Sequence, residues 1–227
     1  LDDLVDLGAL DYELRDFLSA AVRARKQIIV AGATGAGKTT MLRALGAEIP
    51  SDERIITIET ELELGLDRFP DLHPDVVALE AREANVEGVG RVTAADLVRM
   101  SLRMNPDRVI VGEVRGDEII PMLNAMSQGN DGSLSTIHAN SSMEVFNRIS
   151  TYALQAEENL PVEATHMLIA GSINFVVFLR KRNEYEAGGT LERVVESVRE
   201  VTGIDHRVLS SEVFAPGPDG RARRPRW

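Results

Sequence analysis

Between residues 27 and 45, an apolar run, a glycine-rich turn and a helix-like run follow one another. The turn reads Gly-Ala-Thr-Gly-Ala-Gly-Lys-Thr over Gly32–Thr39, and its spacing is that of a P-loop. Its glycines let backbone N–H groups point inward around a phosphate chain, and the next helix directs its positive N-terminal end at the anion. The Lys38 ammonium would reach the outer phosphates, and the Thr39 hydroxyl would be a ligand for Mg²⁺. The pattern predicts a nucleoside triphosphate site formed by Gly32, Ala33, Thr34, Gly35, Ala36, Gly37, Lys38, Thr39 and Thr40.

Two further stretches place carboxylates directly after apolar, strand-like runs. Glu59, Glu61 and Glu63 follow the first of these runs, and Glu113 follows the second, with Gly112 just before it. Ligands of open α/β sheets bind at the carboxyl ends of the strands, so we expect these groups near the P-loop. Phosphoryl hydrolysis needs one carboxylate near Mg²⁺ and one near the attacking water. The alternatives are a solvated acidic turn after the first run and a surface loop residue at Glu113.

A third strand-like run ends on His138, within the polar stretch 129–140. At the same sheet edge its imidazole would donate a hydrogen bond to the γ-phosphate. A purely structural hydrogen bond is the alternative for this histidine. The other three histidines lack a comparable context and are interpreted as structural or solvated.

Strand-like and helix-like runs alternate along most of the chain. We expect strands at 27–31, 54–59, 76–80, 108–112, 133–137 and 174–180, and helices at 38–47, 93–103, 117–127, 141–155 and 162–171, after a first helix capped by Asp11. This alternation predicts an α/β fold with a mostly parallel sheet and helices on both faces.

The pattern changes beyond Gly188. Residues 191–201 and 206–214 predict two strands around a turn at 202–205, forming a β-hairpin appended to the sheet. The tail from Pro216 to Trp227 is rich in proline, glycine and arginine, and we expect it to be mobile. We therefore expect one domain, with a core over 1–188 and the hairpin and tail over 189–227.

Composition narrows the function class. The 227 residues suffice for one large α/β domain, and the net charge of −11 disfavours broad electrostatic binding of nucleic acid. Without cysteine there are neither disulfides nor thiolate metal sites. No run approaches the ~20 apolar residues of a membrane span, and no signal peptide is recognisable. A site for cellular ATP favours the cytosol, and a first residue of Leu1 rather than Met indicates a fragment.

Four motifs together resemble a known family. Gly32–Thr40, Glu59–Leu64, 103–115 and 129–140 stand in the order found in motor ATPases of type II and type IV secretion and pilus assembly. Within that family the chain most resembles the CpaF-like ATPases of Tad (Flp) pili and conjugation-type machines. The resemblance implies a RecA-like P-loop ATPase domain using ATP and Mg²⁺. It also implies a preceding N-terminal domain, which we expect to be absent from the given sequence, and a homo-hexamer on the cytoplasmic face of the inner membrane, against a platform protein.

The resemblance also implies roles for single residues. Lys38 and Thr39 match the Walker A lysine and Mg²⁺ ligand, and the others are Glu63 (Asp box, activation of water), Glu113 (Walker B) and His138 (His box). Arg103 and Arg115 resemble arginines near the γ-phosphate, with structural salt bridges as the alternative. Arg82 and Arg91 are further candidates for reaching a neighbouring subunit's phosphate.

One position departs from the family pattern. Thr60 stands where the family usually has an aspartate, directly after the first glutamate of the Asp box. This change keeps open a nucleotide-dependent binding module with weak hydrolysis. A DNA-translocating RecA-like ATPase is the other alternative, and the net charge of −11 speaks against it.

Overall fold

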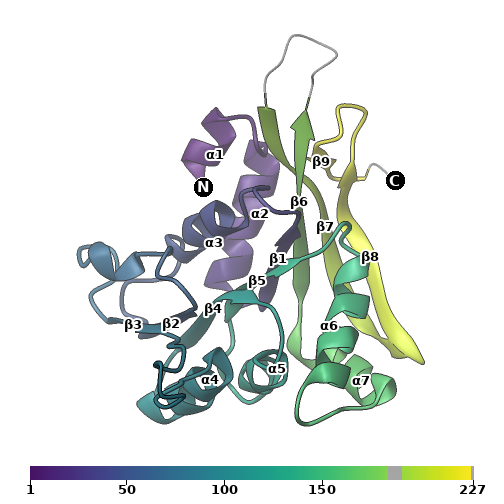
Figure 1. The fold of residues 1–227 in the computed structure, drawn as a ribbon. Helices are drawn as coiled ribbons and strands as arrows, with labels where there is room; N and C mark the ends of the chain where they lie inside the picture. Colours follow the sequence, from purple (N-terminus) through teal and green to yellow (C-terminus); the bar gives the residue numbers. More distant parts are fainter. Residues whose placement is uncertain (184–190, 226–227) are drawn as a thin grey trace.

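The computed structural model describes residues 1–183 and 191–225. The strands of this part form one sheet in the order β3-β2-β4-β5-β1-β6-β7-β8-β9 (Figure 1). Their bounds are β1 Ile28–Gly32, β2 Ile55–Glu59, β3 Val76–Glu80, β4 Arg108–Val114, β5 Leu134–His138, β6 Phe175–Asn183, β7 Leu191–Asp205, β8 Arg207–Pro216 and β9 Ala222–Arg223. Pairing is parallel from β3 to β6 and antiparallel from β6 to β9. The expected mostly parallel α/β sheet is confirmed.

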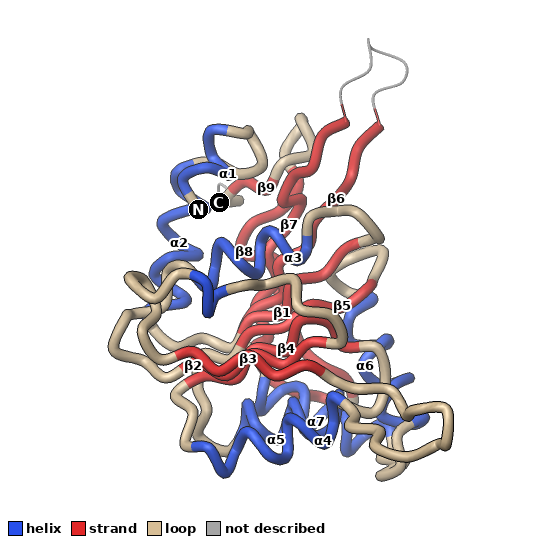
Figure 2. The backbone as a smooth tube through the Cα atoms, turned by 60° about the vertical axis from the view of Figure 1, so that its left-hand side comes forward, coloured by secondary structure: helices blue, strands red, loops and turns tan. Residues whose placement is uncertain are grey.

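Helices cover both faces of the sheet. Their bounds are α1 Asp2–Asp6, α2 Tyr12–Arg23, α3 Lys38–Gly46, α4 Ala94–Ser101, α5 Ile119–Ser127, α6 Glu144–Gln155 and α7 Val162–Ser172, with short 3-10 turns at Leu66–Arg68 and Leu102–Met104. In Figure 2, α1 to α3 lie on one side of the strands, and α4, α5 and α7 lie on the other. Among the described residues no helix is long and apolar enough to cross a bilayer.

Strand alternation explains the two covered faces. In β1, Ile28 and Val30 belong to the core beneath α2 and α3, whereas Ile29 and Ala31 belong to the core beneath α4 to α7. Successive side chains of a strand point to opposite faces, so an uninterrupted apolar strand needs cover on both sides. This arrangement leaves the ends of the strands, rather than a face of the sheet, open for a site.

Side-chain caps are present at the starts of two helices, and the one at Asp11 was expected. The Leu14 amide donates to Asp11 Oδ1 at 2.9 Å at the start of α2. Thr93 and Asp96 bond reciprocally at the start of α4, which is a complete capping box. These local signals fix where the helices begin, and through them where the preceding loops end.

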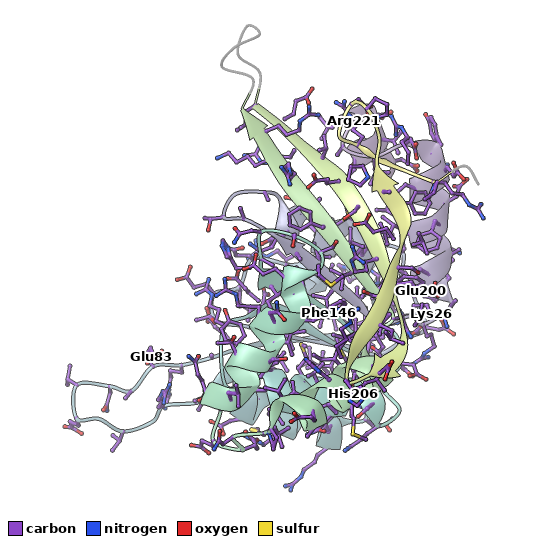
Figure 3. The ribbon with its side chains drawn as sticks, turned by 90° about the vertical axis from the view of Figure 1, so that its right-hand side faces the viewer. Lys26, Glu83, Phe146, Glu200, His206 and Arg221 are labelled. Carbon is purple, nitrogen blue, oxygen red and sulfur yellow. The ribbon has the colours of Figure 1, made fainter. Side chains whose placement is uncertain are left out.

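The β7–β8 hairpin turns later than expected. Residues 202–205, predicted as the turn, continue strand β7, and the chain reverses at His206, whose φ is 53°. The register shifts between Val201 and Gly203, so the glycine is accommodated as an irregularity within the strand instead of starting the turn. Figure 3 shows His206 at the end of the long hairpin.

The C-terminal segment differs from the mobile tail that we expected. β9 pairs with β8, Ala222 is buried, and the Arg223 guanidinium lies 2.7 Å from Asp11 Oδ2. Arg221 Nε donates to the Gly8 carbonyl at 3.0 Å. Residues 221–224 are therefore held against the N-terminal segment. The expected boundary between Gly188 and Gly189 and the last two residues lie outside the described residues.

Candidate nucleotide-binding site

The P-loop joins the carboxyl end of β1 to the first turn of α3. Gly35 and Gly37 have φ values of 71° and 95°, in the left-handed region that glycine adopts without strain. These two residues turn the backbone tightly enough for α3 to start at Lys38 with its N-terminal N–H groups directed at the loop. The sequence predicted this glycine turn leading directly into a helix, and the binding of a phosphate there stays a prediction.

Glu113 stands at an irregularity between β4 and β5. Val111 pairs with Ser135 and Val114 pairs with Ile137. Two residues of β4, Gly112 and Glu113, therefore lie between these pairs where β5 has only one. Such a bulge re-aims a side chain at a sheet edge. Glu113 Oε1 lies 3.5 Å from Lys38 Nζ, and Oε2 accepts from Arg115 at 2.6 Å. The hydrogen bond and the charge of Glu113 raise the pKa of Arg115, so this carboxylate is held between two cations.

The loop after β2 is tied to helix α3. The Thr39 hydroxyl donates to Glu63 Oε2 at 3.2 Å, and Arg43 Nε donates to the Leu64 carbonyl at 2.9 Å. A second nitrogen of Arg43 donates to the Glu63 carbonyl. These bonds place the Glu63 carboxylate beside the residue predicted to bind Mg²⁺.

Glu59 is the buried carboxyl of this edge, with a side chain that is only 5% exposed. Its Oε1 accepts from the Glu63 and Leu64 amides at 3.1 and 3.0 Å, whereas Oε2 is buried without a hydrogen-bond partner among the described residues. A Cβ on Gly112 would lie 2.9 Å from Glu59 Cγ, so only glycine admits this side chain beside β4. Burial raises the pKa of Glu59 despite the two amide bonds, which lower it.

We therefore expect Glu59→Gln to become more stable, relative to wild type, as the pH rises. A carboxyl whose folded-state pKa is raised stabilises the fold below its unfolded pKa, near 4.5, and loses that contribution as the pH rises through the folded value. Glutamine keeps the oxygen that accepts the two amides but never ionises. Urea unfolding at pH 5 and pH 8 measures the difference, with Glu61→Gln, an exposed neighbour, as the control. A difference in stability that is independent of pH would contradict the burial argument.

Two cavities meet at the P-loop. One, of about 440 Å³, is acidic and is lined by Thr34, Gly35, Lys38, Thr39, Glu59, Thr60, Glu61, Glu63, Gly112, Glu113, Arg115 and Thr136. The other, of about 710 Å³, is largely apolar and includes Leu4, Leu7, Leu179, Leu191, Arg193 and Arg221 in its lining. Both share Gly35, Lys38 and Thr39. The loop therefore separates a carboxylate-rich compartment from one that suits an apolar group.

The predicted site residues are not all brought together. Lys38, Thr39, Glu63, Glu113 and Arg115 line the acidic cavity. His138 pairs with Gly32 of the P-loop across β5 and β1 and lies two residues after Thr136, which lines the cavity, but His138 itself is not part of the lining.

Arg103 lies near the amino end of β4, whereas the predicted site lies at the carboxyl ends of the parallel strands. It stands in the 3-10 turn before the amino end of β4 and is exposed. The strand that separates it from Glu113 is about 20 Å long. The expectation that Arg103 lies near the γ-phosphate therefore fails within one chain, because a residue before a parallel strand and one after it occupy opposite edges.

Comparison with known proteins agrees with this geometry. A family model described as "Type II/IV secretion system protein" matches residues 1–200. The chain belongs to this family. It is 42% identical over 164 residues to the type IV secretion system protein VirB11 of Brucella suis, covering 71% of this chain and 44% of that protein. It is 39% identical over 184 residues to the type IV secretion system protein PtlH of Bordetella pertussis, covering 80% and 52%.

A solved relative shares the fold of this secretion-family chain. The crystal structure of the VirB11 ATPase of Brucella suis in complex with sulphate superposes with a TM-score of 0.68 at 34% identity, covering 86% of this chain and 54% of that one. The fold is thus the RecA-like fold of secretion ATPases. The chain spans about half the length of the curated relatives that it matches. The finer assignment to CpaF-like ATPases stays a prediction.

Sequence reasoning missed the walls of the apolar cavity. Leu4 and Leu7 of the N-terminal segment and Arg193 and Arg221 of the C-terminal strands reach the P-loop only through the tertiary fold. The three-residue spacing of the two leucines in an acidic segment was the one available signal. The arginines carried none, because an arginine in a strand is ordinarily a solvated residue.

Proposed function

We propose that this chain is the ATP-binding and ATP-hydrolysing domain of a secretion or pilus-assembly motor. The observation that carries the proposal is the 3.5 Å contact between Lys38 Nζ and Glu113 Oε1, at the point where the two cavities share the P-loop. A Walker A lysine beside a strand-end carboxylate is the arrangement that phosphoryl transfer from a nucleoside triphosphate requires. The phosphate chain lies along the P-loop, with its terminal phosphate toward the acidic cavity and its base toward the apolar one.

The residues at the acidic end divide the chemistry between them. Lys38 and Arg115 supply positive charge where negative charge develops on the terminal phosphate. Glu113 and Glu63 orient the attacking water and accept its proton. Glu59, whose Oε2 has no hydrogen-bond partner among the described residues, lines the same cavity and would contribute to this role. His138 lies at the adjoining strand end, where it would sense the terminal phosphate. Thr60 is exposed and stands where the family usually has an aspartate. The cavity stays negatively charged because glutamates line it.

The donors present suit Mg²⁺. Thr39 supplies a hydroxyl, and Glu63 and Glu113 supply carboxylate oxygens, which are the hard ligands that Mg²⁺ prefers. The part of the chain that the structure describes holds no cluster of three or more metal-ligating side chains. Nucleotide-bound Mg²⁺ takes most of its ligands from phosphate and water, so a single hydroxyl with carboxylates nearby is sufficient. Mg²⁺ would neutralise charge on the outer phosphates.

The family membership supports a place for this domain in a larger assembly. We propose that it works in a homo-hexameric ring at the cytoplasmic face of the inner membrane, against a platform protein of the secretion or pilus machine. We propose that Arg82 and Arg91, on the projecting loop 81–92, reach a neighbouring subunit (Figure 3 labels Glu83 on this loop). In such a ring a neighbour's arginine couples hydrolysis to relative movement.

Phosphate release from ATP tests the proposal. We expect release that requires Mg²⁺ and that rises more steeply than linearly with protein concentration, because part of the site comes from a neighbour. Nucleotide binding without release would replace the motor by a nucleotide-dependent binding module. Release accelerated by added DNA would favour a DNA translocase. A chain that binds neither ATP nor ADP would refute the proposal.

A further inference from the structure

The outer ends of β6 and β7 run beside the P-loop. β6 pairs in parallel with β1, and Leu179 lies opposite Gly32, so the residues after Leu179 extend past the carboxyl edge of the sheet. β7 returns antiparallel, with Lys181 directly opposite Arg193. Figure 1 shows this two-stranded ribbon projecting beyond the other strands. A pair of cations therefore stands next to the phosphate-binding turn.

The two faces of the ribbon differ in whether their basic side chains are paired with carboxylates. On one face each arginine has a carboxylate: Arg180 lies 2.6 Å from Glu196, and Arg182 lies 3.7 Å from Glu192. On the other face, Lys181 and Arg193 have no carboxylate partner among the described residues. Like charges directly opposite each other on paired strands repel and destabilise the ribbon. An anion lying over the pair would relieve this repulsion.

The unpaired face points at the P-loop. Arg193 Nε donates to the Gly35 carbonyl at 2.8 Å, and Arg193 Cδ lies 3.4 Å from the position of a Cβ on Gly37. Lys181 Nζ lies 3.8 Å from the corresponding position on Gly35. The bond to Gly35 is the one side-chain hydrogen bond of Arg193 in the described residues, so most of its five N–H donors are available to a ligand.

The position of the ribbon selects which phosphates it meets. The carboxylates of Glu59, Glu63 and Glu113 lie in the acidic cavity, where the terminal phosphate belongs, whereas Arg193 lines the apolar cavity on the other side of the loop. We propose that Lys181 and Arg193 form a clamp on the inner, α and β, phosphates of the nucleotide bound by their own chain. The inference rests on the proposed function, since it presupposes a nucleotide at the P-loop.

Equilibrium binding of ADP to the chain tests the clamp, because ADP carries the inner phosphates alone. We expect Arg193→Gln to weaken ADP binding about tenfold or more, and Lys181→Gln about threefold, as lost charge-assisted contacts to phosphate. Arg193→Lys retains the charge, and we expect its affinity to fall by less than that of Arg193→Gln. Arg180→Gln is the matched control. It also removes one positive charge, but Arg180 precedes Lys181 on the opposite face of the ribbon, where it is paired with Glu196. We expect this variant to bind ADP like wild type.

The outcomes separate the clamp from the nucleotide site itself. Wild-type chain that fails to bind ADP overturns the proposed function, and the clamp with it. Wild-type binding with unchanged affinity in Arg193→Gln overturns only the clamp. If Arg193→Gln weakens binding while Lys181→Gln does not, or if Arg180→Gln weakens it equally, the arginine supports the loop rather than the phosphates, and the clamp is also overturned. Thermal unfolding without nucleotide verifies that each variant is folded.

Discussion

Replacing Lys38 with alanine is expected to lower the affinity of the chain for ATP by a factor of about 100 or more. The ammonium lies at the junction of the two cavities, so every position of the triphosphate along the loop brings its charge near this group. A charge-assisted contact to phosphate in a shielded site contributes about 3 kcal/mol, which corresponds to that factor. The variant also removes a cation from Glu113, whose freed carboxylate then repels the phosphates. Titration with a fluorescent ATP analogue measures the loss.

A second lysine provides the control for this change. Lys26 is exposed and precedes the amino end of β1, whereas the P-loop follows the carboxyl end of that strand; Figure 3 labels Lys26. Lys26→Ala alters the net charge by the same amount, so a general electrostatic effect would weaken ATP binding in both variants. We expect Lys26→Ala to bind ATP like wild type. Retained ATP affinity in Lys38→Ala would remove the P-loop from the binding site.

Local patterns were sufficient for most of the fold. The apolar runs ending at Gly32, Glu59 and His138 predicted the strands to within a residue or two, because a strand covered on both faces must be apolar throughout. Asp11 predicted the start of α2, because a cap acts on the next few amides. The order of these elements then placed Lys38 and Glu113 at one sheet edge, because parallel strands end on the same side.

Features that depend on register or on distant contacts were not predictable. The bulge that directs Glu113 toward Lys38 arises from the pairing of β4 with β5, and no residue type in this stretch predicts it. The tail after Pro216 has the composition of a solvated segment, yet pairing with β8 and the Arg223–Asp11 ion pair hold it against the domain. The position of Arg103 was missed for a different reason, since it was inferred from a resemblance, whereas the strand order places a residue before β4 at the end opposite Glu113.

Glu113→Gln is expected to keep ATP binding within about threefold of wild type and to lower turnover about 100-fold or more. The amide has the size of the carboxylate and leaves Lys38 and the glycine turn in place, so the binding contacts survive. It carries no charge and accepts no proton, so the attacking water loses a base or an orienting partner. The variant also frees Arg115, whose guanidinium is held at 2.6 Å from Glu113. ATP affinity and phosphate release from one preparation measure the two effects separately.

Because Glu113 forms an ion pair with Arg115, variants of both residues can separate a role in holding Arg115 from a role in acting on water. If the carboxylate serves mainly to hold Arg115, then Arg115→Ala should lower turnover as much as Glu113→Gln does, and the double variant should lose no more than either single one. If Glu113 acts on water, Glu113→Gln should be the more damaging single change. Glu163→Gln, an exposed glutamate in the first turn of α7, should match wild type. Full turnover in Glu113→Gln would leave Glu59, Glu61 and Glu63 as the carboxylates available to the attacking water, because these three line the same cavity from the end of β2 and the loop after it.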